Sequence, residues 1–299
     1  MPSKEIIETR FRQIQDSICS GLEKLDGKAK FKEDLWTRDN AGTDGGGGRT
    51  RVMAHGNLLE KGGVNFSAVY GELPAVLKQE FGANVNHFFA TGVSIVLHPN
   101  SPMVPIIHMN IRYFETDSGV YWFGGGIDLT PHYVNEELAK KFHQKLKNTC
   151  DQFDPVYYPA YKKWADEYFF IPHRGETRGI GGIFFDKIKE DAHHSKQAIF
   201  NFVAAVGETF VPAYAEQVEA TRNLPFNDAH KKWQLLRRGR YVEFNLVYDR
   251  GTKFGLQTSG RIESILMSLP EHASWIYDFV PEKGSEEEKT LLYLKSNSH

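Results

Sequence analysis

Residues 104–114, Val-Pro-Ile-Ile-His-Met-Asn-Ile-Arg-Tyr-Phe, alternate apolar and polar side chains over most of their length. Successive side chains of a β-strand point to opposite faces of its sheet. The alternation therefore predicts a strand with one apolar face, while the other face carries His108, Asn110 and Arg112. The apolar face predicts a core on one side of the sheet only.

Further stretches around this strand have the same β-branched and aromatic character and are separated by turn residues, which predicts strands at 64–73, 87–97, 120–123 and 241–248. Two of these also have polar faces, with Ser94 and His98 on one and Glu243, Asn245 and Asp249 on the other. A half-buried sheet with a solvent-facing side is one interpretation. The polar faces lack lysine, however, and such a composition is more typical of a pocket floor.

Apolar residues at helical spacing predict helices at 5–25, 135–153, 157–169, 196–220, 227–236 and 261–269. The strands cluster early and their connections are short, which favours an antiparallel sheet over alternating βαβ units. We therefore expect an α+β fold in which a large antiparallel sheet is flanked by helices on both sides. Residues 1–299 form a single domain in this prediction, with an N-terminal helix within residues 1–30 and a mobile glycine-rich loop at 37–52.

Composition and charge exclude several classes of protein. Lys and Arg number 36 against 38 Asp and Glu, so the chain lacks the positive excess that nucleic-acid or membrane-surface binding requires. The 2 cysteines, Cys19 and Cys150, are predicted to be reduced thiols. We find no apolar run of about 18 residues that would predict a membrane span. The charged N-terminus predicts no targeting segment, so we expect a cytoplasmic protein.

The glycine-rich segments match no nucleotide-binding loop, and the chain has no Gly-x-Ser-x-Gly motif for a serine nucleophile. The histidines give only a weak indication of a metal site. Imidazoles bind transition metals, yet His98, His108, His143 and His173 lack the i, i+4 spacing of helical zinc sites. His143 falls on the apolar stripe of its predicted helix, where a hydrogen-bonded core histidine is the more common case.

Arginines accompany glycine at several turns, notably in the segments 235–241, 249–252 and 259–261. Guanidinium binds carboxylate or phosphate in a bidentate manner, and glycine lets backbone N–H groups approach the same anion. An ion pair with an acidic side chain is the usual explanation for any single arginine. For the whole set, a small polyanionic ligand is a competing explanation.

Several long segments together resemble the oxygen-dependent coproporphyrinogen III oxidase family, over about residues 30 to 280. The most specific are 94–99, 104–114, 122–131 (Trp-Phe-Gly-Gly-Gly-Ile-Asp-Leu-Thr-Pro), 163–169, 173–186, 234–245 and 248–258. The resemblance implies a homodimer that converts two propionates of coproporphyrinogen III to vinyl groups, giving protoporphyrinogen IX in haem biosynthesis. Molecular oxygen is the implied co-substrate, without an organic cofactor.

The resemblance also implies roles for individual residues. His108 matches the proton donor, and the matching substrate contacts are Ser94, Asn110, Ile111, Arg112, Ser259, Gly260 and Arg261. Bacterial members are often assigned a divalent metal on four histidines, which match His98, His108, His143 and His173; whether a metal is needed stays open. Thr177 replaces a second basic residue, so Arg178 is expected to hold its anion with less help.

The chemistry of the substrate suggests further candidates. Four propionates need cationic clamps, for which we add Arg178 and Arg250, and removal of a pyrrole N–H proton needs a base. Asp249 is the first candidate for that base and Asp128 the second. Two alternatives remain: a hydrolase that uses a histidine-bound metal to activate water, and a tetrapyrrole carrier without turnover.

Overall fold

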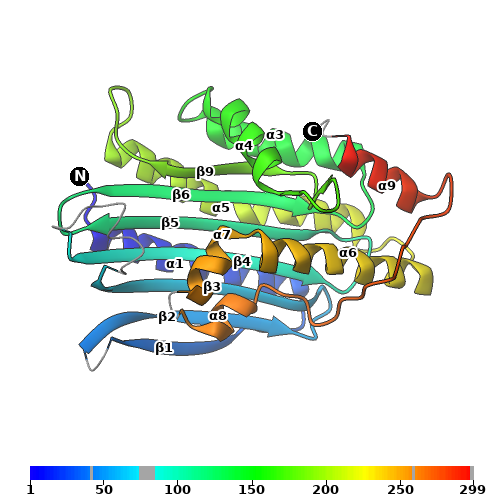
Figure 1. Cartoon of the computed structure of the whole chain (residues 1–299), viewed down its shortest axis with the longest axis horizontal. Coiled ribbons are helices and arrows are strands. Elements are labelled where there is room, and N and C mark those ends of the chain that lie inside the picture. The colour runs from blue at the N-terminus through cyan, green and yellow to red at the C-terminus, as the bar shows by residue number, and fades with distance from the viewer. Residues whose placement is uncertain (41–42, 74–84, 258–259, 297–299) are drawn as a thin grey trace.

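The computed structural model describes residues 1–40, 43–73, 85–257 and 260–296. Within them, seven strands form one antiparallel sheet in the order β1-β2-β3-β4-β5-β6-β9 (Figure 1). These strands are Lys32–Asn40 (β1), Thr43–Ala54 (β2), Leu59–Glu72 (β3), His87–Pro99 (β4), Ile106–Thr116 (β5), Tyr121–Thr130 (β6) and Gly182–Ile188 (β9). A separate short pair joins Phe170–Ile171 (β7) to Glu176–Thr177 (β8). The predicted antiparallel sheet is confirmed.

Helices cover both faces of this sheet, as predicted. Behind it in Figure 1 lie α1 (Lys4–Asp26) and α5 (Lys196–Thr221), with α3 (Glu136–Asp151) and α4 (Tyr157–Tyr168) packed beside α5 and β9. In front lie α6 (Asp228–Val247), α7 (Arg250–Gln257) and α8 (Ile262–Leu266). A last helix, α9 (Glu286–Lys295), contacts β8. The main core therefore lies between the sheet and the α1–α5 layer.

Strand β5 has the two faces that its sequence predicts. Ile107, Met109 and Ile111 are fully buried on the side of α1 and α5, whereas His108 and Asn110 are half-buried on the other side. The packing on the apolar side is tight, since a Cβ added to α5 Gly207 would lie 3.0 Å from the Ile111 Cδ1 atom. The helix-free part of the second face is where a ligand can reach the sheet.

Helix α5 is long and apolar enough to cross a membrane by length and composition, although a core helix passes the same test. Over half of its apolar stretch, 56%, is buried inside the protein. Its buried side chains, among them Phe202, Val203 and Phe210, belong to the core cluster beneath the sheet. These contacts account for the apolar composition of α5.

The predicted strand at 241–248 is wrong, because these residues form the second half of α6. Tyr241 and Phe244 are buried one helical turn apart, and a capping box at Asn227 starts a helix of 20 residues that no proline interrupts. Gly239, in the segment 235–241 that we expected to form a turn, lies inside this helix. A Cβ there would come 2.5 Å from the Ser274 carbonyl oxygen, so glycine serves a close approach rather than a turn.

The predicted mobile loop at 37–52 is also wrong, because its residues lie in β1 and β2 except for two outside the described ranges. Glycine weakens a strand unless another group approaches its backbone closely. Here that group is Trp36 of β1. A Cβ on Gly48 would lie 2.2 Å from the Trp36 ring, and one on Gly47 would lie 2.2 Å from the Trp36 carbonyl oxygen.

Candidate active site

Helices α6, α7 and α8 lie in front of one face of the sheet (Figure 1), and this face carries the polar side chains of β3, β4 and β5. Register places Asn65 of β3 opposite Ser94 of β4, and Ser94 opposite Asn110 of β5. The next strand contributes no side chain at this level, because Asn110 pairs with Gly126 of β6. Asn65, Ser94, Asn110 and Gly126 form one row across four strands, which we call the floor, with three neutral polar side chains beside a buried glycine. The prediction that His108, Asn110 and Arg112 share the polar face of β5 is confirmed.

His108, Asp128 and Arg178 meet at one end of this floor. The His108 Nδ1 atom lies 2.8 Å from Asp128 Oδ1, and Arg178 Nη2 lies 2.8 and 3.0 Å from the two Asp128 oxygens. Arg178 Nη1 in turn donates to Asn245 Oδ1 of α6 at 2.9 Å. Burial raises the pKa of Asp128, but Arg178 and His108 outweigh it and hold that pKa below its ordinary value. The ionised Asp128 therefore orients the His108 ring and leaves its Nε2 atom for a reaction partner.

Arg178 is held by rings as well as by Asp128. Its guanidinium carbon lies 4.4 Å from the Phe169 centroid, 4.7 Å from that of Tyr241 and 4.6 Å from that of Phe244. We predicted Arg178 as a substrate contact. In the structure Arg178 is only 3% exposed and the anion that it binds is Asp128, and the contact with substrate stays a prediction. Its role is to compensate the buried carboxylate beside His108.

Asp249 lies between the end of α6 and the start of α7. Its Oδ1 atom accepts a hydrogen bond from the Tyr168 hydroxyl at 2.8 Å, and its Oδ2 atom accepts from both the N–H and the hydroxyl of Thr252 at 2.7 Å. Burial alone would raise the pKa of Asp249. The hydrogen bonds from Thr252 and Tyr168 and the nearby His108 lower this pKa by more than burial raises it, so the net shift is downward. Asp249 is half-buried, which leaves it more accessible than Asp128.

Arginines stand at both ends of the floor. Arg112 donates to Asn110 Oδ1 at 2.9 Å and pairs with Asp186 Oδ1 at 2.8 Å. Arg250 lies 5.0 Å from the Tyr168 ring centroid and 4.0 Å from Asp186. A Cβ on Gly124 would lie 2.7 Å from Arg112 Nε, so only glycine at this position leaves room for the Arg112 side chain.

The opposite end of the floor is bordered by Arg261, at the start of α8. Its guanidinium pairs with Asp34 of β1, donates to Ser264 at 3.1 Å and lies 5.9 Å from the Trp36 ring. Gly260 donates its backbone N–H to the Gly255 carbonyl, whereas Ser259 lies outside the described residues. The predicted contact Ile111 points its side chain into the core, so only its backbone borders the floor.

The four histidines predicted as metal ligands have separate partners. His98 is fully buried and lies 2.9 Å from the Ser268 carbonyl, and His143 lies 2.9 Å from the Ile180 carbonyl. His173 contacts the Tyr248 hydroxyl and the Glu243 carboxylate, each at 2.7 Å. No group of three or more His, Cys, Asp or Glu side chains among the described residues is placed to hold a metal ion. These positions do not fit a four-histidine metal centre.

Aromatic side chains form a wall next to Asp249. Tyr168 and Phe184 stack with ring centroids 4.0 Å apart and planes 10° from parallel, and Phe169 meets His108 edge-on at 6.1 Å. Tyr168 and Thr252 are functional candidates that the sequence did not reveal, and Asn245, which the sequence placed on a polar strand face, instead lies in helix α6 and accepts a hydrogen bond from Arg178. Tyr168 is 81 positions from Asp249 and Asn245 is 67 from Arg178, so local spacing carried no signal.

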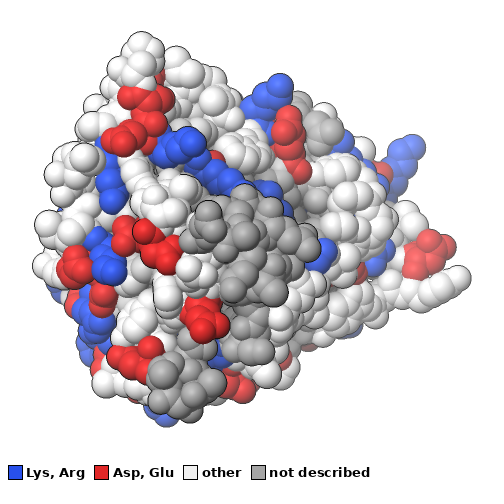
Figure 2. All heavy atoms as spheres, turned by 60° about the vertical axis from the view of Figure 1, so that its left-hand side comes forward, with Lys and Arg blue, Asp and Glu red and all other residues white. Residues whose placement is uncertain are grey.

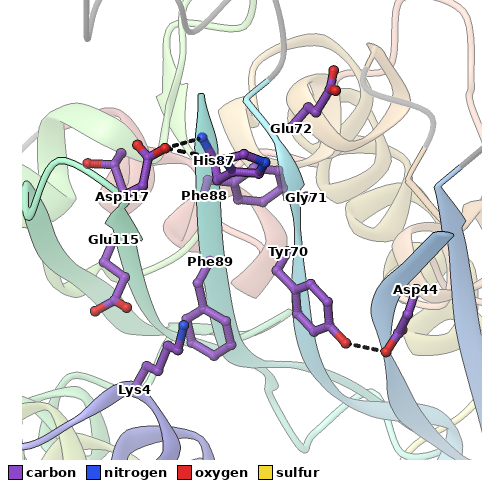
Figure 3. A pocket seen from close by; sticks show the side chains of 11 residues that line it. Lys4, Asp44, Tyr70, Gly71, Glu72, His87, Phe88, Phe89, Glu115 and Asp117 are labelled. Atoms are coloured by element: carbon purple, nitrogen blue, oxygen red, sulfur yellow. Dashed lines mark hydrogen bonds and ion pairs between the residues drawn. The ribbon is translucent and has the colours of Figure 1, made fainter. Parts of the chain in front are cut away.

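Two hollows lie apart from this face. One of about 510 Å³ is formed at the ends of β3, β4 and β5, where Lys4 and Glu115 flank Phe89 (Figure 3). The other, of about 480 Å³, lies beside Tyr157 and His194. None of the candidate site residues lines either hollow. On the end of the molecule seen in Figure 2, described acidic and basic side chains are interspersed, which matches the near-neutral charge of the chain.

Comparison with known proteins adds independent evidence. Residues 6–299 match the family model of coproporphyrinogen III oxidase. The chain is 50% identical to an oxygen-dependent coproporphyrinogen-III oxidase, chloroplastic, of Glycine max and to coproporphyrinogen-III oxidase 1, chloroplastic, of Arabidopsis thaliana. Each comparison covers 95% of this chain and 76% of the relative. An oxygen-dependent coproporphyrinogen-III oxidase of Drosophila melanogaster is 49% identical over 97% of this chain and 76% of its own length. The chain belongs to the coproporphyrinogen III oxidase family.

Proposed function

We propose that the chain is an oxygen-dependent oxidoreductase that converts two propionates of coproporphyrinogen III to vinyl groups, yielding protoporphyrinogen IX in haem biosynthesis. Each conversion turns one propionic acid side chain and one O₂ into a vinyl group, CO₂ and H₂O₂. The two electrons pass from the side chain to oxygen. The observation that carries the proposal is one sheet face, in a chain of this family, with arginines at its edges and the Asp128–His108 carboxylate–imidazole pair at one end of its floor.

The geometry supports a division of labour around the substrate. The Arg112 and Arg250 end and the Arg261 end can each hold a propionate, because guanidinium is a fitting partner for carboxylate. The Tyr168–Phe184 stack offers an apolar wall to the reduced macrocycle. This arrangement fixes the reacting side chain relative to Asp249 and His108, which is how binding contributes to rate.

We assign proton removal from a pyrrole N–H to Asp249. Both Asp128 oxygens are engaged by Arg178 and His108 and the residue is 1% exposed, so it cannot reach a substrate directly. Asp249 is ionised near neutral pH and accessible, and its negative charge stabilises the electron-poor macrocycle that forms as electrons leave. His108, oriented by Asp128, is the proposed proton donor through Nε2.

Metal dependence provides a separate prediction. Because the four histidines have their own partners, we expect the purified protein to keep most of its oxygen-dependent activity after treatment with a chelator and removal of that chelator. The measurement is the initial rate before and after treatment, with metal content determined in parallel. Loss of activity that only one divalent ion restores would establish a functional metal.

The chain is proposed to act as a homodimer. Residues 242–247 are helical and Met267 is buried, so the segment offers no apolar strand face and Met267 no exposed side chain for the interface. Apolar exposure nevertheless remains nearby: Trp275, Ile276 and Tyr277 are 55, 48 and 99% exposed. Permanent dimer interfaces resemble a core cut in half, and these side chains suit one.

The dimer predicts twice the chain mass of 34.1 kDa in light scattering at micromolar concentration. Replacing Trp275 and Tyr277 by serine should shift the protein toward the monomer, whereas Leu292→Ser on exposed α9 should not. A mass of one chain for the unchanged protein would contradict the proposal. The cytoplasmic location remains a prediction, since plant relatives are named chloroplastic.

A further inference from the structure

A chain of hydrogen bonds crosses from α8 to the polar floor. Arg261 Nη1 lies 3.1 Å from Ser264 Oγ, Ser264 Oγ lies 2.8 Å from Thr50 Oγ1, and Thr50 Oγ1 lies 2.7 Å from Asn65 Oδ1. Trp36 Nε1 joins the same Thr50 oxygen at 3.0 Å. The chain thus connects an arginine at the edge of the site to an asparagine on its floor.

The hydrogen bond that Thr50 donates to Asn65 Oδ1 determines the direction of the others, because a hydroxyl has only one hydrogen to donate. Arginine and the indole of tryptophan can only donate, so Ser264 accepts from Arg261 and Thr50 accepts from Trp36. Ser264 then uses its own hydrogen toward Thr50, and Thr50 has its single hydrogen for Asn65 Oδ1. The Thr50 hydroxyl thus fixes the orientation of the Asn65 carboxamide, and no hydrogen bond within the described part of the chain occupies its Nδ2 donors.

Asn65 occupies the floor and not the core. Its neighbours in β3, Val64 and Phe66, are fully buried on the α1 side, while Asn65 is half-buried on the opposite face. It pairs with Ser94, and Ser94 pairs with Asn110, so the three side chains lie in one row on adjacent strands about 4.8 Å apart.

Asn110 repeats the arrangement of Asn65 on the other side of Ser94. Its Oδ1 atom accepts from Arg112 at 2.9 Å, which likewise directs its Nδ2 group away from the occupied oxygen. The row therefore presents amide donors on both sides of a hydroxyl; Arg112 orients the Asn110 amide directly, and Thr50 orients the Asn65 amide. Such a row fits a carboxylate, whose two oxygens only accept when ionised.

We propose that Asn65 is a further substrate-binding residue, whose Nδ2 group donates to a propionate carboxylate of the tetrapyrrole held beside Ser94, and that Thr50 is the positioning residue that orients it. The inference rests on the proposed function for the identity of the ligand. It adds a neutral contact on β3 to the arginines at the edges of the site, and it explains why Thr50 is buried between Trp36, Ser264 and Asn65.

The first test is the kinetics of Asn65→Asp with coproporphyrinogen III. Aspartate keeps an oxygen for the Thr50 hydroxyl but faces the propionate with negative charge in place of a donor. We expect KM to rise at least 10-fold while kcat changes by less than about 3-fold, because a hydrogen bond to a charged group typically contributes a 10- to 100-fold difference in affinity. Asn65→Ala should raise KM in the same direction and covers the case in which the aspartate variant does not fold.

The matched control is Asn201→Asp on the exposed side of α5, where the asparagine oxygen also accepts a side-chain hydrogen bond, from Gln197 at 2.9 Å. It makes the same charge change away from the floor and should leave KM unchanged.

The positioning role of Thr50 has its own test. Thr50→Val should raise KM by about 2- to 10-fold through loss of the orienting hydrogen bond. Thr50→Ser keeps the hydroxyl and should have the KM of the wild-type protein.

The outcomes separate this inference from the proposed function. If the unchanged protein shows no oxygen-dependent vinyl formation, the proposed function fails. If that activity is present but folded Asn65→Asp and Asn65→Ala keep a normal KM, the inference is wrong and Asn65 has only a structural role. If the Asn65 variants have a lower melting temperature but a normal KM, the conclusion is the same.

Discussion

Replacing Asp249 by asparagine is expected to lower kcat by about 10²- to 10⁴-fold, the usual contribution of a positioned acid or base, while the protein still folds. An asparagine oxygen can accept both Thr252 hydrogen bonds that now reach Oδ2, and its Nδ2 group can donate to the Tyr168 hydroxyl. The substitution therefore keeps the local network and removes the negative charge. Steady-state kinetics and thermal melting measure the two effects separately.

A matched control leaves the carboxylate in place. Tyr168→Phe removes one of the three hydrogen bonds to Asp249 and should change kcat far less than Asp249→Asn does. If folded Asp249→Asn retains near-normal kcat, Asp249 is not the base. If instead it mainly loses stability, Asp249 acts as a structural partner of Thr252 and Tyr168.

Replacing Arg178 by leucine is expected to lower the free energy of unfolding by about 3–5 kcal/mol, because it leaves the Asp128 carboxylate buried without its compensating charge. The Arg178 guanidinium also packs against the rings of Phe169, Tyr241 and Phe244, and the substitution removes these contacts as well. Urea denaturation near neutral pH measures the change. Arg10→Leu, which breaks an exposed ion pair with Glu208, is the matched control and should cost less than about 1 kcal/mol.

The pH dependence of this effect has a defined sign. Arg178 and His108 lower the Asp128 pKa in the folded protein, so the ionised carboxylate contributes stability that is fully present above its unfolded pKa of about 4. That contribution is lost as pH falls through the lower, folded pKa. The difference in the free energy of unfolding between the wild-type protein and Arg178→Leu should therefore become smaller in acid. A cost below about 1 kcal/mol at neutral pH would show that Arg178 does not compensate Asp128.

The alternation of β5 was enough to predict which side of the sheet is polar, because a strand whose one face is buried has little freedom of register. The same reasoning failed for 241–248, where Val242, Phe244 and Leu246 also alternate with polar residues. There the helix that starts at Asn227 continues through the segment and buries Tyr241 and Phe244 on one side. Alternation over a few residues therefore does not distinguish a half-buried strand from the end of a helix.

The site was predicted only in part. His108, Asn110 and Arg112 share one strand, so local pattern placed them together, whereas the partner of Asp128 lies 50 positions away in Arg178. Sequence alone marked Arg178 as a cation for substrate, since nothing local shows that three aromatic rings enclose it. Long-range packing decides whether an arginine meets a ligand or a buried carboxylate.

The central claim is tested most directly by mixing the purified protein with coproporphyrinogen III and following oxygen uptake, CO₂ release and vinyl formation together. The account predicts two O₂ consumed and two CO₂ released for each protoporphyrinogen IX formed, with no turnover when oxygen is excluded. Tight binding without oxygen uptake would instead identify a tetrapyrrole carrier. Metal-dependent hydrolysis that proceeds equally without oxygen would contradict the account as well.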